Sequence, residues 1–378
     1  MDQPIIDHRG PDFSALAKSV FGGLKRVFKT QQPVVIYSST GTGAWEGAMV
    51  NTLSPGDRVL AFETGQFSNL WCVLGEKHGL KVDLVPGDWR HPADAAEAEK
   101  RLVADKGHEF KAILMVHSET STGVLSPVLA MRQALDRAKH PALLLVDTIS
   151  SLAVNDFRHD EWGVDVAISG SQKGLMLPPG LSFNALSKKA VEANKKAKLP
   201  RAFFEWQPMI DANQSGFFPY TPATMLFFGL EESLAMLEEE GLDNVFARQE
   251  RLAEAARRAA RAWGLDIQCA DPKAYASALT GIRMPDGVNA DEVRKVILER
   301  YDLSLGAGLG KVAGKVFRIG HLGWFNDLML TGALSGVEMG LAAAGVPHKR
   351  GGVDAAMEYL GGNTIGMAAA PRAAATGR

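Results

Sequence analysis

The sequence contains little cysteine: Cys72 and Cys269 are its two cysteines in 378 residues, and they lie far apart. Neither stands in a metal-ligand spacing, and the nine histidines form no HExxH-like pair, so we expect no metal site. Two isolated cysteines also exclude a disulfide framework and favour a reducing, cytoplasmic setting.

Long apolar runs and an excess of one charge are also missing. No stretch approaches the length of a membrane span, and the start, MDQPIIDHRGPDF, lacks the basic and then apolar order of a signal peptide. The 41 basic and 43 acidic residues give a formal net charge of −2, whereas proteins that bind nucleic acid or anionic membranes carry basic excess. We therefore expect neither nucleic acid nor a membrane as a partner.

Seven short apolar runs between residues 33 and 187 alternate with segments whose apolar residues recur at helical spacing. Several runs are apolar at every position, which is typical of strands covered on both faces by helices. The alternation predicts an α/β fold whose large domain has a seven-stranded, mostly parallel sheet, with LSFNALS as the antiparallel exception. The predicted strands are PVVIYSS, DRVLAFE, KVDLVPG, KAILMVH, ALLLVD, VDVAIS and LSFNALS.

The pattern changes at about residue 223, where a long helical stretch begins that is broken at Gly241. After it, the strand-like LTGIRMP and KVFRIGHLG alternate with the helical ADEVRKVILERY and NDLMLTGALSGVEMGLAAAG, which predicts a smaller C-terminal α/β domain. We place the large domain, with an N-terminal segment, at 1–244 and the small domain at 245–345. The Ala- and Gly-rich tail at 346–378 is predicted to be partly disordered.

The residues that follow the strands are the first candidates for a site, because ligands of open α/β sheets bind beyond the carboxyl ends of the strands. After the first strand, Thr40, Gly41 and Thr42 open a helix. Backbone N–H groups and hydroxyls at such a start converge on an anion, and the helix dipole assists. A glycine turn with a threonine cap explains the same residues equally well, and the spacing matches neither a Walker loop nor a dinucleotide fingerprint.

Three further strand ends carry an aromatic ring, a carboxylate and a lysine. Phe67 follows DRVLAFE, Asp147 ends the apolar PALLLVD, and Lys173 follows VDVAIS. Taken singly, Phe67 fits a core residue and Asp147 fits a helix cap. Taken together with the anion cradle, they are the groups that pyridoxal phosphate requires: a Schiff-base lysine, a stacking surface, and an acidic partner for the pyridinium nitrogen. The segment GLGKVA at 308–313 mimics a nucleotide signature, but it leads into a strand instead of opening a helix.

With these motifs the chain resembles the class V (fold type I) pyridoxal-phosphate aminotransferases, among them the serine–glyoxylate and alanine–glyoxylate aminotransferases. The resemblance runs from about residue 5 to residue 345 and implies the fold of the type I transferases. The segment GSQKGLMLPPG combined with KVFRIGHLG is highly specific, whereas STGTG alone is not. The other motifs that carry the resemblance are SPGDRVLAFETGQF, HSETSTGV, LLVDTISS, FFPYTPAT and EEGLDNVFARQ.

The resemblance implies roles for individual positions. Lys173 matches the Schiff-base lysine, and Asp147 matches the partner of the pyridine nitrogen. Arg318, in KVFRIG, matches the arginine that binds the substrate carboxylate, for which a planar guanidinium is suited. Thr221, in PYTP, matches a phosphate ligand donated by a second subunit, which implies a homodimer with shared active sites. The other positions that match the cofactor site are Thr40, Gly41, Thr42, Phe67, Thr120, Ile149 and Gln172.

Two positions depart from the family pattern. Relatives carry a further N-terminal segment with a Gly-Pro sequence near the active site, whereas this chain starts at MDQPIIDHRG. We expect either that the start is placed too late or that the segment is absent, which would affect closure over the substrate. Phe218 stands where some relatives have a tyrosine that reaches the phosphate, so that hydrogen bond is expected to be missing.

The implied activity is transamination with ping-pong kinetics through the Lys173 aldimine, most simply from L-serine to glyoxylate, giving hydroxypyruvate and glycine. Alanine or aspartate are alternative donors, to glyoxylate or pyruvate, because Arg318 recognises only the carboxylate that all of them share. A pyridoxal-phosphate lyase or cysteine desulfurase is a weaker alternative, since a desulfurase needs a nucleophilic loop cysteine and Cys72 lies in a helical pattern. A non-catalytic binding protein would be expected to lack Lys173 or Arg318.

Overall fold

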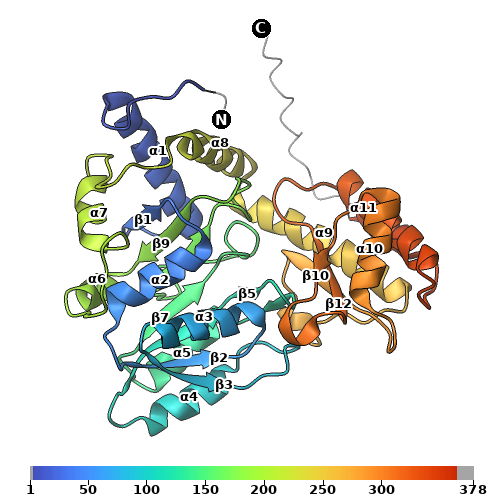
Figure 1. Cartoon of the computed structure of the whole chain (residues 1–378), viewed down its shortest axis with the longest axis horizontal. Coiled ribbons are helices and arrows are strands. Elements are labelled where there is room, and N and C mark those ends of the chain that lie inside the picture. Colours follow the sequence, from blue (N-terminus) through green and yellow to red (C-terminus); the bar gives the residue numbers. More distant parts are fainter. Residues whose placement is uncertain (1–2, 364–378) are drawn as a thin grey trace.

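The computed structural model describes residues 3–363. Two β-sheets organise this part of the chain (Figure 1). In this part of the chain the main sheet has seven strands in the order β1-β9-β8-β7-β4-β2-β3. Strand β9 runs antiparallel to both of its neighbours and the other pairs are parallel, which confirms the predicted sheet and its antiparallel exception. The strands are β1 (Val34–Tyr37), β2 (Arg58–Phe62), β3 (Lys81–Val85), β4 (Phe110–Val116), β7 (Leu143–Asp147), β8 (Val166–Gly170) and β9 (Ser182–Leu186).

Helices cover both faces of the main sheet, which is why its central strands are apolar at every position. Because side chains alternate along a strand, Val34 and Ile36 of β1 pack with α1, α4, α5 and α8, whereas Val35 and Tyr37 pack with α2, α3, α6 and α7. Within residues 3–363, no helix is both long and apolar enough to cross a membrane. The helices are α1 (Pro11–Phe28), α2 (Gly41–Thr52), α3 (Gln66–Lys77), α4 (Ala95–Ala104), α5 (Val128–Arg137), α6 (Lys188–Asn194), α7 (Trp206–Asn213) and α8 (Thr224–Glu240).

The second sheet is antiparallel, with the order β10-β12-β11, and it lies beside the main sheet in Figure 1. The predicted break of the long helical stretch is confirmed: Gly241, with φ +79°, separates α8 from α9. The helices and strands that follow α8 are α9 (Leu242–Ala262), β10 (Leu279–Arg283), α10 (Ala290–Tyr301), β11 (Gly306–Ala307), β12 (Val316–Gly320), α11 (Asp327–Ala343) and α12 (Gly352–Gly362). A short hairpin, β5 (Ser118–Glu119) and β6 (Val124–Leu125), and two 3₁₀ turns (Pro272–Ala274 and Gly310–Val312) complete the fold.

Two helices do not respect the predicted domain limits. Residues 244 and 245 both lie in the first turn of α9, so that helix runs across the predicted boundary. Helix α12 lies within the predicted tail, and its Ala356 and Leu360 are buried in the same apolar cluster as Leu252 of α9. The tail residues 364–378, on which the predicted disorder also falls, lie outside the described residues.

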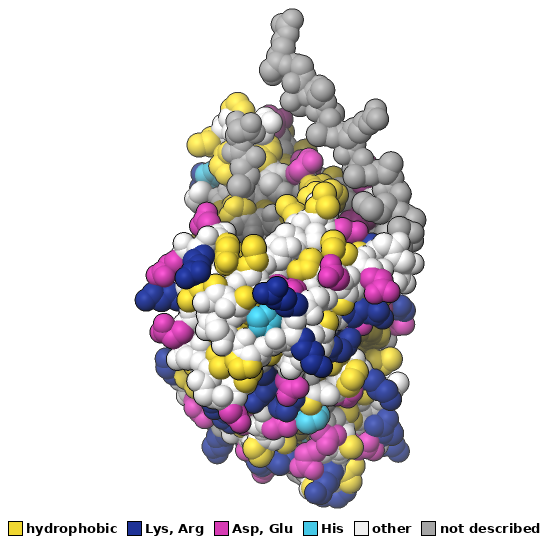
Figure 2. Space-filling model, turned by 90° about the vertical axis from the view of Figure 1, so that its right-hand side faces the viewer, with side chains coloured by type: hydrophobic (Ala, Val, Ile, Leu, Met, Phe, Trp, Pro, Cys, Tyr) yellow, Lys and Arg dark blue, Asp and Glu magenta, His cyan; other side chains and the backbone are white. Residues whose placement is uncertain are grey.

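On the face of the molecule shown in Figure 2, basic and acidic side chains are interspersed.

Candidate active site

Asp147 is the buried carboxylate at the carboxyl end of β7, and its side chain is held on two sides. Trp45 Nε1 donates to Asp147 Oδ2 at 2.8 Å, and the backbone N–H of Ile149 donates to Oδ1 at 2.7 Å. The residue is 3% exposed, and this burial raises the pKa of Asp147 to about 7, with the nearby Glu119 charge acting in the same direction. The helix-cap interpretation therefore accounts for Oδ1, which accepts from the backbone. The other oxygen, Oδ2, is held by Trp45 of α2.

Lys173 lies on the turn that joins β8 to β9, and it is electrostatically coupled to Asp147. Burial lowers the pKa of the Lys173 amine, the positive charge of Arg318 lowers it further, and Asp147 opposes both. A lowered pKa favours the neutral amine, which is the nucleophilic form. The turn itself is closed by Ser171: its backbone N–H donates to Leu181 O at 3.0 Å, and its Oγ donates to Pro178 O at 2.7 Å.

The first turn of α2 lies beside these groups and is formed by small residues at close approach. A Cβ atom at Gly41 would lie 2.2 Å from Ile149 Cδ1, and one at Gly170, which ends β8, would lie 3.7 Å from the Gly41 nitrogen. Thr40 is the N-cap residue, but its hydroxyl makes no capping hydrogen bond, so the cap interpretation of this threonine is wrong. The N–H groups of Gly41 and Thr42 are at a helix start, where intrahelical acceptors are missing, so they can receive an anion.

Gln172 adds a buried acceptor next to this turn. Its Oε1 is inaccessible to solvent and has no hydrogen-bond partner among residues 3–363. The same atom lies 2.8 Å from the position of a Cβ on Gly170, so it is directed toward the end of β8. A buried polar atom without a partner is costly, which indicates that a further group completes its contacts.

Phe67 and Thr120 are held in place by their neighbours. Phe67 lies in the first turn of α3 and is partly buried against the layer of α2, and its N–H donates to Glu119 Oε1 at 3.3 Å. Glu119 also accepts from the backbone N–H of Ser68 at 3.1 Å, so this buried carboxylate caps the helix that carries Phe67. Burial raises the pKa of Glu119, although its hydrogen bonds oppose the change. The hydroxyl of Thr120 is hydrogen-bonded to that of Ser150.

Arg318 reaches this edge from the second sheet. Its Nε donates to Ala307 O at 2.8 Å, and its Nη1 donates to Thr120 O at 2.6 Å. The guanidinium is partly buried, which lowers the pKa of Arg318, while the nearby Glu119 raises it. Within residues 3–363 Nη2 makes no hydrogen bond, so this open edge of the guanidinium keeps donors for a ligand.

Thr221 and Phe218 line a small pocket together with Ser38, which directly follows β1. Thr221 is exposed, next to Tyr220 and Ser38, and no hydrogen bond within residues 3–363 joins it to the groups around Lys173. Phe218 is stacked on Phe21, with ring centroids 5.8 Å apart, so it belongs to the apolar packing under α1.

Sequence reasoning missed three residues of this arrangement: Trp45, Ser150 and Ala307. Trp45 follows Gly41 by four residues, about one helical turn, so its place on the same face of α2 could have been found from the spacing. Ser150 follows Asp147 by three residues within the motif LLVDTISS and gave no signal of its own. The role of Ala307 depends on its carbonyl, which no side-chain pattern shows.

The residues fit pyridoxal phosphate. Burial disfavours the charged form of Asp147, and within residues 3–363 its hydrogen-bond partners are the neutral donors of Trp45 and Ile149. The protonated ring nitrogen would supply the missing cation. The start of α2 offers backbone N–H donors for a phosphate. Lys173 supplies an amine of lowered pKa, so the donor set contains every chemical function that the cofactor needs.

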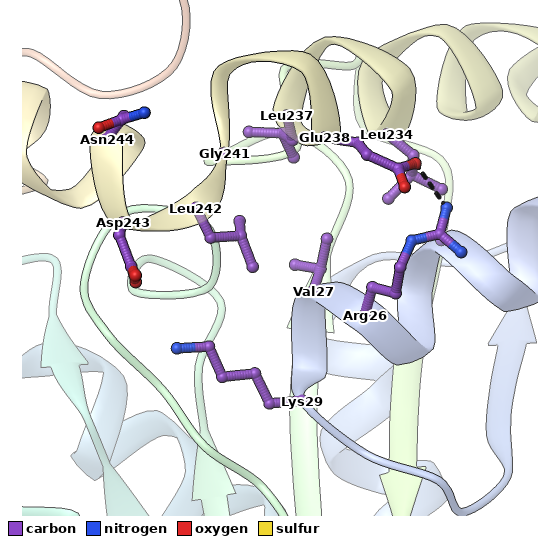
Figure 3. Close-up of a pocket in the computed structure, with 11 residues that line it drawn as sticks. Arg26, Val27, Lys29, Leu234, Leu237, Glu238, Gly241, Leu242, Asp243 and Asn244 are labelled. Carbon is purple, nitrogen blue, oxygen red and sulfur yellow. Dashed lines mark hydrogen bonds and ion pairs between the residues drawn. The ribbon is translucent and has the colours of Figure 1, made fainter.

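A separate cavity of about 610 Å³ lies between α1 and the junction of α8 and α9 (Figure 3). Apolar side chains, among them Val27 and Leu237, line it, and the ion pair between Arg26 and Glu238 lies at its edge, with an N–O distance of 2.7 Å. None of the predicted site residues lines this cavity.

The chain is similar to known aminotransferases over nearly its whole length. The sequence model of the family described as aminotransferase class-V matches residues 7–317. The L-aspartate–glyoxylate aminotransferase of Paracoccus denitrificans is 48% identical over 95% of this chain and 91% of the relative. The serine–glyoxylate aminotransferase of Hyphomicrobium methylovorum is 48% identical over 98% of this chain and 92% of the relative. A crystal structure of alanine–glyoxylate aminotransferase from Nostoc sp. has a TM-score of 0.84, with 29% identity over 90% of each chain.

Proposed function

Because the chain belongs to the class V aminotransferases, which use pyridoxal phosphate, we propose that it transfers the amino group of L-serine to glyoxylate. The products are hydroxypyruvate and glycine. The observation that carries the proposal is the coupling of Lys173 to both Asp147 and Arg318, which combines an amine of lowered pKa, a buried acid and a carboxylate anchor. The choice of serine is supported by the Hyphomicrobium relative, which is named for that donor.

Each group has a place in the reaction. Asp147 would hold the ring nitrogen of the cofactor, Lys173 its reactive carbon, and the start of α2 with Gln172 its phosphate. Thr120 would contact the ring hydroxyl, while Phe67 and Ile149 would pack against the ring. When bound, pyridoxal phosphate supplies an electron sink for removal of the substrate α-proton.

Lys173 would act as the proton carrier. After the substrate amine has displaced it, its Nζ is free, and a lowered pKa keeps that amine able to accept the α-proton. Arg318 would pair with the substrate carboxylate through its open edge, and the carbonyls of Ala307 and Thr120 fix the plane of the guanidinium. Binding and orientation by Arg318 would therefore place the α-carbon next to Lys173.

Assembly and location belong to the same proposal. We infer a homodimer in which Thr221 of one subunit completes the phosphate site of the other, which agrees with its exposed place in the single chain. We also propose a cytoplasmic location, in line with the two isolated cysteines, and fractionation of the source cells would test it.

Aspartate is a second candidate donor, because a relative of equal identity is named for aspartate and glyoxylate. A donor panel with glyoxylate held fixed separates the candidates: serine, alanine and aspartate are compared by kcat/KM, with glycine and the matching 2-oxo acid identified as products. The highest kcat/KM is expected for serine. A higher value for aspartate or alanine would change the donor, and no turnover with any of them by cofactor-loaded protein would overturn the proposal.

A further inference from the structure

The segment 306–313, which contains the GLGKVA sequence, connects the second sheet to the edge of the main sheet. It begins in β11, where Gly306 pairs with Arg318 and Ala307 pairs with Phe317. It then turns through the 3₁₀ residues Gly310–Val312 before β12 begins. The segment therefore lies beside Arg318 at one end and beside the main sheet at the other.

The contact with the main sheet is an ion pair. Lys311 Nζ donates to Glu63 Oε1, and Glu63 directly follows β2. Glu63 is 9% exposed and also accepts from Trp89 Nε1 at 3.0 Å and from Asn69 Nδ2 at 3.1 Å. Burial alone raises the pKa of Glu63, but Lys311 and the other donors outweigh it and lower the pKa to about 2. The carboxylate is thus charged and fixed, and Lys311 binds to a rigid partner.

Glycines allow this segment to lie close to the main sheet. Gly310 has φ +50°, and a Cβ there would lie 2.2 Å from Gln66 Oε1 and 2.7 Å from Trp89 Cη2. Val312 is buried together with Trp89 and Val316. Gln66 precedes Phe67, so the packed segment touches the helix start that carries the predicted stacking ring.

The other end of the segment holds the guanidinium. Ala307 O accepts from Arg318 Nε at 2.8 Å, and β11 is two residues long, so this carbonyl has little sheet pairing to fix it. Its position depends on what holds the rest of the segment. Within residues 3–363, the ion pair between Lys311 and Glu63 is the charged contact that holds segment 306–313 against the main sheet.

We propose that Lys311 is a positioning residue for substrate recognition, because its ion pair with Glu63 fixes segment 306–313 and thereby the Ala307 carbonyl that orients Arg318. This inference rests on the proposed role of Arg318 as the carboxylate anchor. Within residues 3–363, the side chain of Lys311 is hydrogen-bonded to Glu63 and to none of the groups around Lys173. Its loss is therefore expected to weaken binding of every carboxylate substrate while the chemical step stays intact.

The test compares Lys311→Met with Lys311→Arg, which keeps the charge, and with Lys315→Met, which removes an exposed lysine four residues away. In the holoenzyme, Lys311→Met should raise KM for donor and acceptor by about fivefold to tenfold with kcat within about twofold, because one charge-assisted contact is lost. Lys311→Arg should restore KM, and Lys315→Met should match the wild type. The visible cofactor band should be the same in all four proteins.

Two further variants distinguish a positioning role of Lys311 from a general effect of its charge. Gly310→Ala should raise KM in the same way through the crowding at Gln66, independently of charge. Lys311→Met combined with Arg318→Lys should raise KM no further than Arg318→Lys alone, because both act through one guanidinium. If the wild type transaminates and Lys311→Met keeps a normal KM, or the two changes add fully, the positioning role is wrong. If the wild type itself fails to transaminate, the proposed function is wrong and this inference with it.

Discussion

Trp45 and Asp147 are joined by a hydrogen bond of 2.8 Å from the indole Nε1 to the carboxylate Oδ2. The Trp45 ring is stacked on Trp71, with centroids 5.7 Å apart and planes 10° apart, which fixes the direction of the N–H. Trp45 belongs to α2, the helix whose first turn carries Gly41. One helix therefore offers its N-terminus to an anion and also directs the buried acid of β7.

Replacing Trp45 with Phe keeps the stacked ring and removes the donor to Asp147. We expect kcat/KM to fall about tenfold, since a hydrogen bond to a charged group contributes about 1.5 kcal/mol or more. Trp71→Phe is the matched control, because Trp71 Nε1 is buried without a hydrogen-bond partner among residues 3–363. Equal losses in both variants would show that ring packing, and not the hydrogen bond, matters.

Asp147 makes the stability of the cofactor-free protein depend on pH. Its folded pKa is raised from 3.8 to about 7, so the folded chain retains the proton where the unfolded chain has lost it. The free energy of unfolding should therefore fall as pH rises from about 4 to about 7, by about 2 to 3 kcal/mol between pH 5 and pH 8. Urea denaturation at both pH values should show this decline for the wild type and less of it for Asp147→Asn. Parallel declines in both proteins would contradict the assignment.

Lys173→Ala should abolish turnover, by about 10³-fold or more, because no other amine replaces the proton carrier. The protein should still bind pyridoxal phosphate, although more weakly. Stopped assays with serine and glyoxylate, together with absorbance spectra, measure both effects. Lys188→Ala, which changes an exposed lysine at the start of α6, is the control. Turnover near the wild-type rate in Lys173→Ala would remove this residue from the mechanism.

Arg318→Lys should raise KM by about tenfold for every amino and 2-oxo acid alike, because a point charge cannot pair bidentately with the carboxylate. Steady-state kinetics with serine, alanine and glyoxylate give the comparison, and kcat should change far less. An effect confined to one substrate would show that Arg318 recognises a side chain and not the shared carboxylate.

Mixed dimers test whether Thr221 serves the neighbouring site. Lys173→Ala chains and Thr221→Ala chains are each expected to be poorly active alone. After co-refolding, a heterodimer contains one site with Lys173 from one chain and Thr221 from the other, so part of the activity should return. Mixing Lys173→Ala with itself is the control. No gain over the separate variants would argue for sites that lie within single chains.

The main sheet could be predicted because its strands bury both faces, which leaves a run of apolar residues for each strand. The antiparallel β9 was predictable from the short turn after Lys173. Helices α1, α6, α7 and α12 were not predicted, because in the sequence they lie in segments without a clear alternation of strands around them. In α12, Ala356 and Leu360 become core residues only through contact with α9.

Within the site, strand ends identified Asp147, Lys173 and the start of α2, since topology alone brings such ends to one edge. Contacts between distant elements could not be found this way. The bond from Arg318 to the Thr120 carbonyl spans 198 residues, and that from Lys311 to Glu63 spans 248. Such contacts depend on how the second sheet is placed against the first, and no local pattern encodes that placement.

The closed turn at Ser171 has a consequence for motion. Its hydrogen bonds tie the segment of Lys173 to the centre of the main sheet, so the amides of Ser171 and Leu181 belong with the slowest to exchange with solvent. Asp147 ends the strand next to β8 in the same sheet. Any opening between the two sheets would then carry Arg318 away and leave the lysine and the acid in register.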